Sequence, residues 1–222
     1  MNAVTSKNIS VTTAQPDISA VPGQRLVIVS DAWLPQINGV VRTLDRTRQE
    51  MEKLGLEVHV IGPDRFRTIP CPTYPEIRLA MNALWALPKM LKDLMPAAIH
   101  IATEGPLGSA ARRFCKKHKH PFSTSFHTRF PEYIHARCGL PVSITYAWMR
   151  KFHGDASVTM VTTPTMRTDL DSRNFKNLEI WSRGVDLELF RPRPKDILDF
   201  PRPIFMNIGR VAVEKNIGAF LE

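Results

Sequence analysis

The chain has few cysteines and no long hydrophobic run. Its 222 residues include three scattered cysteines, Cys71, Cys115 and Cys138, an odd number without the spacing of a zinc site. We therefore expect free thiols in a reducing cytosol and no bound metal. No apolar stretch is long enough for a transmembrane helix. Residues 1–24 are rich in Ser, Thr and Asn and lack the apolar segment of a secretory signal, which predicts a disordered leader.

Several common catalytic motifs are absent as well. The sequence has no Gly-x-Gly-x-x-Gly fingerprint, no Gly-x-Ser-x-Gly elbow, no His-Glu-x-x-His and no Walker A loop. Simple NAD-binding, serine-hydrolase, zinc-protease and ATPase functions therefore lack support, and we expect no cofactor.

Positive charge is plentiful, with a formal net charge of +9. Such a balance favours anionic partners. Part of the charge is concentrated in Arg112–His120, which predicts either a solvated helix end or a docking site for an anionic membrane surface. The membrane-docking candidates are Arg112, Arg113, Lys116 and Lys117. Because no basic strands are interleaved with aromatic residues, we expect no nucleic-acid partner.

The order of short apolar runs predicts an α/β fold with a Rossmann-like, doubly wound parallel sheet. Strands are expected at 25–30, 57–61, 98–102, 121–126, 157–162 and 178–181. Helices are expected at 40–54 (closed by Gly55), 81–95, 107–117, 142–153 and after Pro164. Pro88 should kink or split the second of these helices, and residues 62–77 show no clear period.

A proline-rich stretch separates this pattern from the end of the chain. We expect residues 25–190 to form an acceptor-binding domain, 191–203 to be a linker and 204–222 to begin a second domain. That second domain should open with a buried strand at 203–208 and the start of a helix. Arg210 and Lys215 precede this helix N-terminus, where a phosphate is favoured. Because the chain ends at Glu222, the sequence predicts the first half of a two-domain enzyme.

Ligands of an open parallel sheet gather at the carboxyl ends of its strands. Three predicted loops carry polar or glycine residues at that edge. The first holds Asn38 and Gly39, the second Glu104, and the third His127 with Arg129 and Glu132. Each also has a plainer interpretation, as a turn, a helix-capping neighbour or a structural histidine.

Four segments resemble motifs of one family, the retaining GT-B glycosyltransferases of family four. The resemblance is to the branch of GDP-mannose-dependent α-mannosyltransferases and related lipid glycosyltransferases. The segments follow the family's order and are Pro35–Leu44 (PQINGVVRTL), Phe126–Tyr133 (FHTRFPEY), Gly184–Pro192 (GVDLELFRP) and Gly209–Asn216 (GRVAVEKN). The resemblance runs from Arg25 to Glu222. It implies two Rossmann-like domains facing across a cleft, with the acceptor on the first and the sugar nucleotide on the second.

The resemblance also implies roles for particular residues. Gly39 would approach the donor phosphates and transferred sugar, and His127 would adjoin that sugar as the catalytic candidate. Arg210 and Lys215 would hold the diphosphate, whose charge grows as the nucleoside diphosphate leaves. The family's two glutamates spaced eight apart are absent from this sequence, and Ala97 stands where the family usually has Asp. The acceptor or cleft candidates are Asn38, Glu104, Arg129 and Glu132.

The implied function is transfer of a hexose, with mannose as the first expectation, from GDP-mannose or a UDP-sugar to a lipid or glycan acceptor with retention of configuration. The enzyme would be cytoplasmic and peripheral on the inner face of the membrane. Two alternatives stay open. In the first, this chain is an incomplete form of the enzyme, and the C-terminal domain lies on a separate chain or on a longer form of this chain. In the second, it is a non-catalytic acceptor- or membrane-binding remnant.

Overall fold

The computed structural model describes residues 23–71, 74–194, 200–201, 203–209 and 216–221. The chain divides into two compact units, Met1–Arg183 and Gly184–Glu222. Because the described residues begin at 23, the predicted leader at 1–24 lies almost wholly outside them. The linker at 191–203 stays a prediction.

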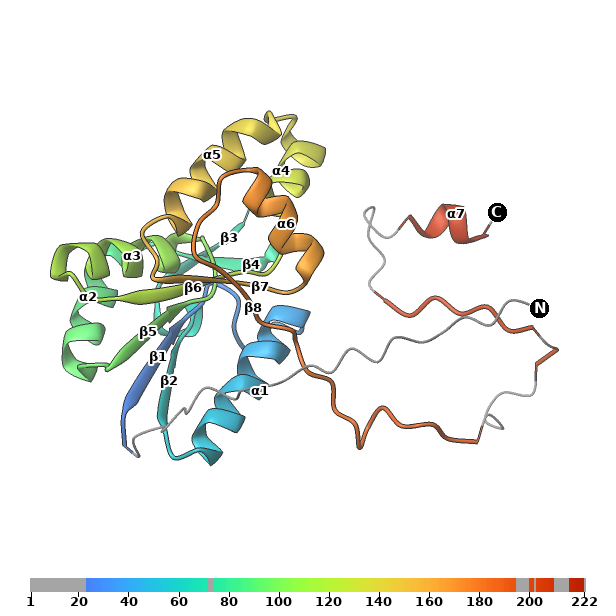
Figure 1. The fold of residues 1–222 in the computed structure, drawn as a ribbon, viewed down its shortest axis with the longest axis horizontal. Coiled ribbons are helices and arrows are strands. Elements are labelled where there is room, and N and C mark those ends of the chain that lie inside the picture. Colours follow the sequence, from blue (N-terminus) through green and yellow to red (C-terminus); the bar gives the residue numbers. More distant parts are fainter. Residues whose placement is uncertain (1–22, 72–73, 195–199, 202, 210–215, 222) are drawn as a thin grey trace, which may run out of the picture. The chain divides into compact units, whose positions relative to one another are not determined.

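A parallel sheet of six strands forms the centre of the first unit (Figure 1). Its strand order is β2-β1-β5-β6-β7-β8, and every neighbouring pair is parallel. The strands are β1 (Arg25–Val29), β2 (Glu57–Ile61), β5 (Ala98–Ile101), β6 (Phe122–Phe126), β7 (Val158–Val161) and β8 (Leu178–Ile180). The predicted α/β fold and all six predicted strands are confirmed. The chain reverses its direction of travel between β1 and β5, which is where such sheets open a crevice.

Helices cover both faces of the sheet (Figure 1). They are α1 (Gly39–Lys53), α2 (Ala83–Leu94), α3 (Pro106–His118), α5 (Val142–His153) and α6 (Pro164–Ser172). Alternate residues of β1 face opposite sides. Val27 and Val29 pack in the cluster formed with α2 and α3, whereas Ile28 packs in the cluster formed with α1.

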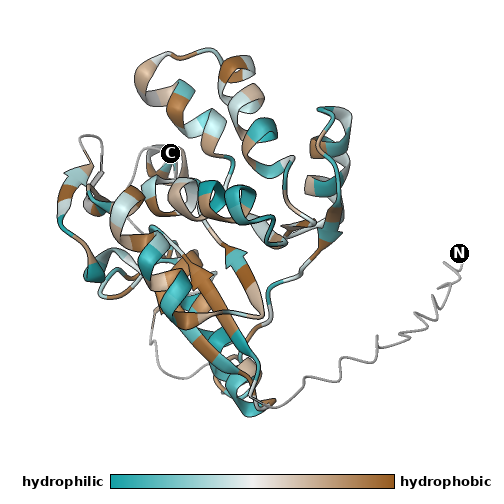
Figure 2. Ribbon diagram, turned by 90° about the vertical axis from the view of Figure 1, so that its left-hand side faces the viewer, coloured by the Kyte–Doolittle hydropathy of each residue, from teal (hydrophilic) through white to brown (hydrophobic). Residues whose placement is uncertain are grey.

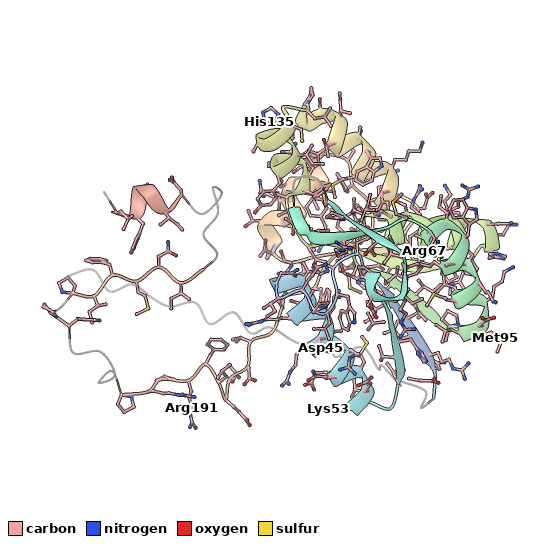
Figure 3. All side chains as sticks on the ribbon, turned by 180° about the vertical axis from the view of Figure 1, so that it is seen from behind. Asp45, Lys53, Arg67, Met95, His135 and Arg191 are labelled. Atoms are coloured by element: carbon pink, nitrogen blue, oxygen red, sulfur yellow. The ribbon has the colours of Figure 1, made fainter. Side chains whose placement is uncertain are left out.

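The hydropathy of the elements matches this layering. Figure 2 shows hydrophobic residues concentrated along the strands and mixed colours on the helices. Strands covered on both faces need apolar side chains on both, whereas a helix needs them on one side only. On the solvent side of α1, Arg48 bonds to Asp45 and Glu52, and Lys53 bonds to Glu50. Asp45 and Lys53 are labelled in Figure 3.

The sequence pattern missed several short elements. Residues 62–77, which show no period, contribute a 3-10 turn, η1 (Pro63–Arg65), and most of an antiparallel pair, β3 (Thr68–Cys71) with β4 (Tyr74–Ala80). Prolines interrupt the alternation there, which hides the pair from a periodicity argument. The helix α4 (Phe130–Cys138) was missed because it is short and has a weak amphipathic pattern.

Pro88 was predicted to kink or split its helix, and the split is wrong, because α2 runs unbroken from Ala83 to Leu94. An interior proline removes one helical hydrogen bond and costs about 3 kcal/mol. The core-facing residues Ala83, Leu87 and Leu91 are almost fully buried, and this packing offsets the cost.

The predicted buried strand at 203–208 is also wrong. Residues 203–209 form no strand, and the Phe205 and Ile208 side chains are 79% and 86% exposed. A strand needs a neighbour to pair its backbone groups, and the described part of the second unit contains none. What that part does contain is a turn closed by Asp186, whose carboxylate accepts the N–H groups of Glu188 and Leu189, and the short helix α7 (Ile217–Leu221).

Candidate functional site

The carboxyl ends of β6, β7 and β8 come together around one open pocket. Its volume is about 320 Å³, and its lining side chains are polar: His127 follows β6, Thr162 and Thr163 follow β7, and Ser182 and Arg183 follow β8. Hydroxyl, imidazole and guanidinium groups can all hydrogen-bond to a polyhydroxylated or anionic ligand. The pocket therefore lies where the fold class predicts ligand binding.

His127, the predicted catalytic residue, is fixed in place by Arg183. The Nη2 atom of Arg183 lies 3.1 Å from His127 Nδ1 and 3.2 Å from the His127 carbonyl oxygen. The Trp181 ring lies 5.9 Å from the imidazole, centroid to centroid. Burial, followed by the charges of Arg183, His100 and His153, lowers the pKa of His127 to about 3. The imidazole is therefore neutral at physiological pH.

The start of α1 reaches the same guanidinium group. Asn38 caps the helix, its Oδ1 accepting the N–H groups of Val40 and Val41 at 3.0 Å each. A Cβ atom on Gly39 would lie 3.7 Å from Arg183 Nη1, an ordinary contact distance. Gly39 and His127, predicted from segments far apart in the sequence, thus both adjoin Arg183. Within the described residues, the local geometry therefore permits a side chain at position 39.

The crevice between β1 and β5 holds a buried carboxylate that sequence analysis missed. Asp31 accepts hydrogen bonds from the Thr103 hydroxyl and the Leu107 N–H, both at 2.8 Å, and from the Gly108 N–H at 3.3 Å. Burial raises the pKa of Asp31, against the effect of these hydrogen bonds. The Asp31 carboxylate thus accepts the backbone N–H groups at the N-terminus of α3, so these groups are not free to bind a phosphate.

Glu104 follows β5 at the same edge but faces the protein interior. Its Oε1 lies 3.3 Å from His153 Nε2, and the two side chains are 16% and 2% exposed. His153 Nδ1 in turn lies 2.9 Å from the Thr124 hydroxyl. The carboxylate thus takes part in a polar contact between the β5 loop, α5 and β6. Its role toward an acceptor stays a prediction.

Arg129 and Glu132 tie the short helix α4 to its neighbours. Arg129 lies 3.5 Å from Asp169 of α6 and 3.9 Å from Glu132. Glu132 accepts a hydrogen bond from the Tyr146 hydroxyl of α5 at 2.8 Å. These contacts favour a structural role for both residues, and a contact to an acceptor stays a prediction.

The cations at the basic end of α3 are of two kinds, those held in contacts within the protein and those that are exposed. Arg112 donates to the carbonyl oxygens of Lys151 and Phe152 and pairs with Asp155, and Lys116 pairs with the same carboxylate at 2.9 Å. Arg113 and Lys117 are exposed. These contacts assign Arg112 and Lys116 a part in joining α3 to α5 and to the turn after it, so Arg113 and Lys117 are the better probes of an outside partner.

Two further predicted residues, Arg210 and Lys215, lie outside the described residues, so their place in a diphosphate site stays a prediction. Within the described ranges, no three His, Cys, Asp or Glu side chains gather as a metal site. Five residues of the site were not predicted from the sequence: Asp31, Thr162, Thr163, Ser182 and Arg183. Each lies within three residues of the end of an observed strand, so extending the carboxyl-edge argument to every predicted strand would have found them.

The chain is similar in sequence to known glycosyltransferases. The sequence model of Glycosyltransferase Family 4 matches residues 37–189. The chain is 24% identical over 220 residues to a GDP-mannose-dependent alpha-mannosyltransferase of Mycobacterium tuberculosis, covering 88% of this chain and 58% of that protein. It is 23% identical to a sulfoquinovosyl transferase of Arabidopsis thaliana, covering 91% of this chain and 44% of the relative.

A shorter match has higher identity. The chain is 32% identical over 126 residues to an alpha-monoglucosyldiacylglycerol synthase of Acholeplasma laidlawii, covering 50% of this chain and 31% of that protein. In each of these comparisons the chain spans at most 58% of the relative's length.

Proposed function

The chain belongs to glycosyltransferase family 4, and on this premise we propose that its carboxyl-edge pocket serves the transfer of a hexose from a nucleotide-diphosphate sugar to a lipid or glycan acceptor, with retention of configuration. Mannose is the first expectation for the hexose and GDP-mannose for the donor, since relatives named for that donor match most of this chain. A UDP-sugar is the alternative donor in this proposal. Sugars other than mannose stay open, because the relatives also include proteins named for sulfoquinovose and for a glucosylated diacylglycerol.

The observation that carries this proposal is a neutral histidine in a hydroxyl-lined pocket at the carboxyl edge of the sheet. His127 shares the pocket with Thr162, Thr163 and Ser182, which suits a ligand made of hydroxyl groups. A neutral imidazole can donate to or accept from a sugar hydroxyl without adding a charge beside the reacting carbon. The diphosphate would be held separately by Arg210 and Lys215, which stabilise the charge that develops on the leaving group.

The test compares residues 1–222 alone with a fusion protein in which residues 1–216 are joined, after Asn216, to the C-terminal domain of a family member. We expect nucleoside diphosphate release, measured with a lipid acceptor, from the fusion and very little from residues 1–222. Aligning donor and acceptor across a closed cleft supplies about 7 to 11 kcal/mol of barrier reduction, and it needs both sides of the cleft.

Two outcomes would contradict the proposal. Full activity of residues 1–222 alone would overturn the two-domain argument. A fusion that folds in both parts and binds the nucleotide sugar, yet transfers nothing to any lipid or glycan acceptor, would favour a non-catalytic acceptor- or membrane-binding role.

A surface on α3 and α5 favours a second proposal, peripheral docking on an anionic membrane. The helix α5 exposes Ile144 (56%) and Trp148 (43%) one turn apart. Trp148 and Lys151 line a pocket of about 240 Å³ together with Arg112 of α3. An aromatic ring beside cations suits the interface between headgroups and acyl chains. No helix among the described residues is both long and apolar enough to span a bilayer.

The docking proposal assigns the exposed Arg113 and Lys117 of α3 to the same membrane-facing surface. It predicts that Arg113→Ser with Lys117→Ser weakens binding to anionic vesicles about tenfold or more at low salt. Each cation near such a surface contributes about 1 kcal/mol, and salt screens it. Vesicle co-sedimentation measures the change. The matched control removes two cations from α1, Arg42→Ser with Lys53→Ser, and should bind like the unmodified chain. Equal binding to anionic and neutral vesicles would rule out this surface.

A further inference from the structure

The end of β8 supplies a guanidinium group that links three parts of the site. Arg183 Nη2 donates to His127 Nδ1 at 3.1 Å and to the His127 carbonyl oxygen at 3.2 Å. Its Nη1 atom lies 3.7 Å from the position that a Cβ on Gly39 would take. Arg183 therefore holds both the ring and the backbone of His127, and it does so against the first residue of α1.

These contacts decide which imidazole nitrogen carries the proton. A guanidinium group can donate hydrogen bonds but cannot accept them, so His127 Nδ1 has to be the acceptor. A neutral imidazole then carries its hydrogen on Nε2. That nitrogen is buried and has no hydrogen-bond partner among the described residues. A buried polar atom without a partner calls for an explanation, and a donor kept for a ligand is one.

Burial, and after it the surrounding charges, lower the pKa of His127 and keep the ring neutral. The charged or titratable groups that act on His127 are Arg183 at the end of β8, His100 on β5 and His153 on α5. His100 is itself held by the Ser123 and Ser125 hydroxyls, 2.9 Å from its two nitrogens, and burial lowers its pKa to about 4. No carboxylate is among these groups, so none stabilises an imidazolium at position 127.

We infer that Arg183 is a positioning residue that locks His127 in the Nε2–H tautomer and orients it, so that Nε2–H is the donor offered to a hydroxyl of the bound hexose. The identity of the ligand rests on the proposed function. The tautomer does not, because it follows from contacts within this chain. A sugar hydroxyl has a free lone pair to accept this hydrogen bond.

The experiment reads the protonation of His127 directly in residues 1–222. Ring-nitrogen NMR of isotope-labelled histidine distinguishes the two tautomers, and the His127 signals are assigned by their loss in His127→Gln. The unmodified chain should show a single Nε2–H tautomer that stays neutral down to the acid limit of the fold. In Arg183→Met we expect a mixture of tautomers and protonation beginning at higher pH, since a positive neighbour and a fixed donor are both removed.

Two further variants keep the test decisive. Arg183→Lys retains a positively charged donor group and should keep most of the Nε2–H form, and it serves if the methionine variant does not fold. Arg150→Met is the control: Arg150 also donates to a carbonyl oxygen, that of Arg173, and its loss should leave His127 unchanged. A single Nε2–H tautomer and an unchanged titration in folded Arg183→Met would overturn the inference.

The two-domain fusion separates this inference from the proposed function. There, Arg183→Met should lower kcat roughly tenfold to hundredfold with a smaller change in KM, as expected for a misplaced catalytic group. If the fusion transfers no hexose but the tautomer still changes in Arg183→Met, the proposed function fails and the positioning role stands. If the fusion is active and Arg183→Met leaves kcat unchanged, the positioning role fails.

Discussion

His127→Ala is expected to lower the kcat of a two-domain enzyme built from this chain by about a hundredfold or more. Loss of a donor that acts mainly in the transition state costs about 10²–10³ in kcat. The variant should change KM less, because the ring contributes more to the transition state than to binding of the ground state. Steady-state kinetics of nucleoside diphosphate release in the fusion protein measures both.

His135→Ala is the matched control for this substitution. His135, labelled in Figure 3, is an exposed histidine of α4 whose Nδ1 lies 3.0 Å from the Leu140 carbonyl oxygen. Its loss should leave kcat within about twofold. The double variant Arg210→Ala with Lys215→Ala should lower kcat as His127→Ala does if the cation pair holds the diphosphate. A His127→Ala enzyme as active as its His135→Ala counterpart would remove His127 from the catalytic site.

Gly108→Ala is expected to destabilise the first unit by about 3 kcal/mol or more. Gly108 lies in the first turn of α3, and a Cβ there would fall 1.8 Å from the Thr103 carbonyl oxygen. A backbone atom cannot rotate away as a side chain can. The helix N-terminus would have to shift, and its Leu107 and Gly108 N–H groups would lose their hydrogen bonds to the buried Asp31 carboxylate.

Urea denaturation followed by tryptophan fluorescence measures this loss as a lower midpoint. Gly39→Ala is the control, because it is also a glycine in the first turn of a helix but its Cβ would meet only an ordinary contact at 3.7 Å. That control should stay within about 0.5 kcal/mol of the unmodified chain. Equal midpoints for the two variants would contradict the close approach of α3 to the loop after β5.

Periodicity in the sequence was enough for the main sheet and for most of the helices around it. Runs such as Leu26–Val29 are apolar on successive positions because both faces of the strand are covered. The requirement for apolar side chains on both faces is visible in a short stretch of the sequence. The strand predicted at 203–208 shows the limit of the same rule. An apolar run becomes a strand only when another strand pairs with it, and the run alone does not contain that information.

The candidate site shows the same division. The sequence alone placed His127 and Gly39 at the carboxyl edge. The position of each strand along the chain and the composition of the loop after it can be read from the sequence without knowledge of the fold. Only the tertiary structure decided that Arg183, 56 residues after His127, donates to its ring. Only the tertiary structure decided that Asp31 reaches across 76 residues to the N-terminus of α3. The physical reason is that a hydrogen bond depends on where two backbones meet in space, and residue type alone leaves that meeting undetermined.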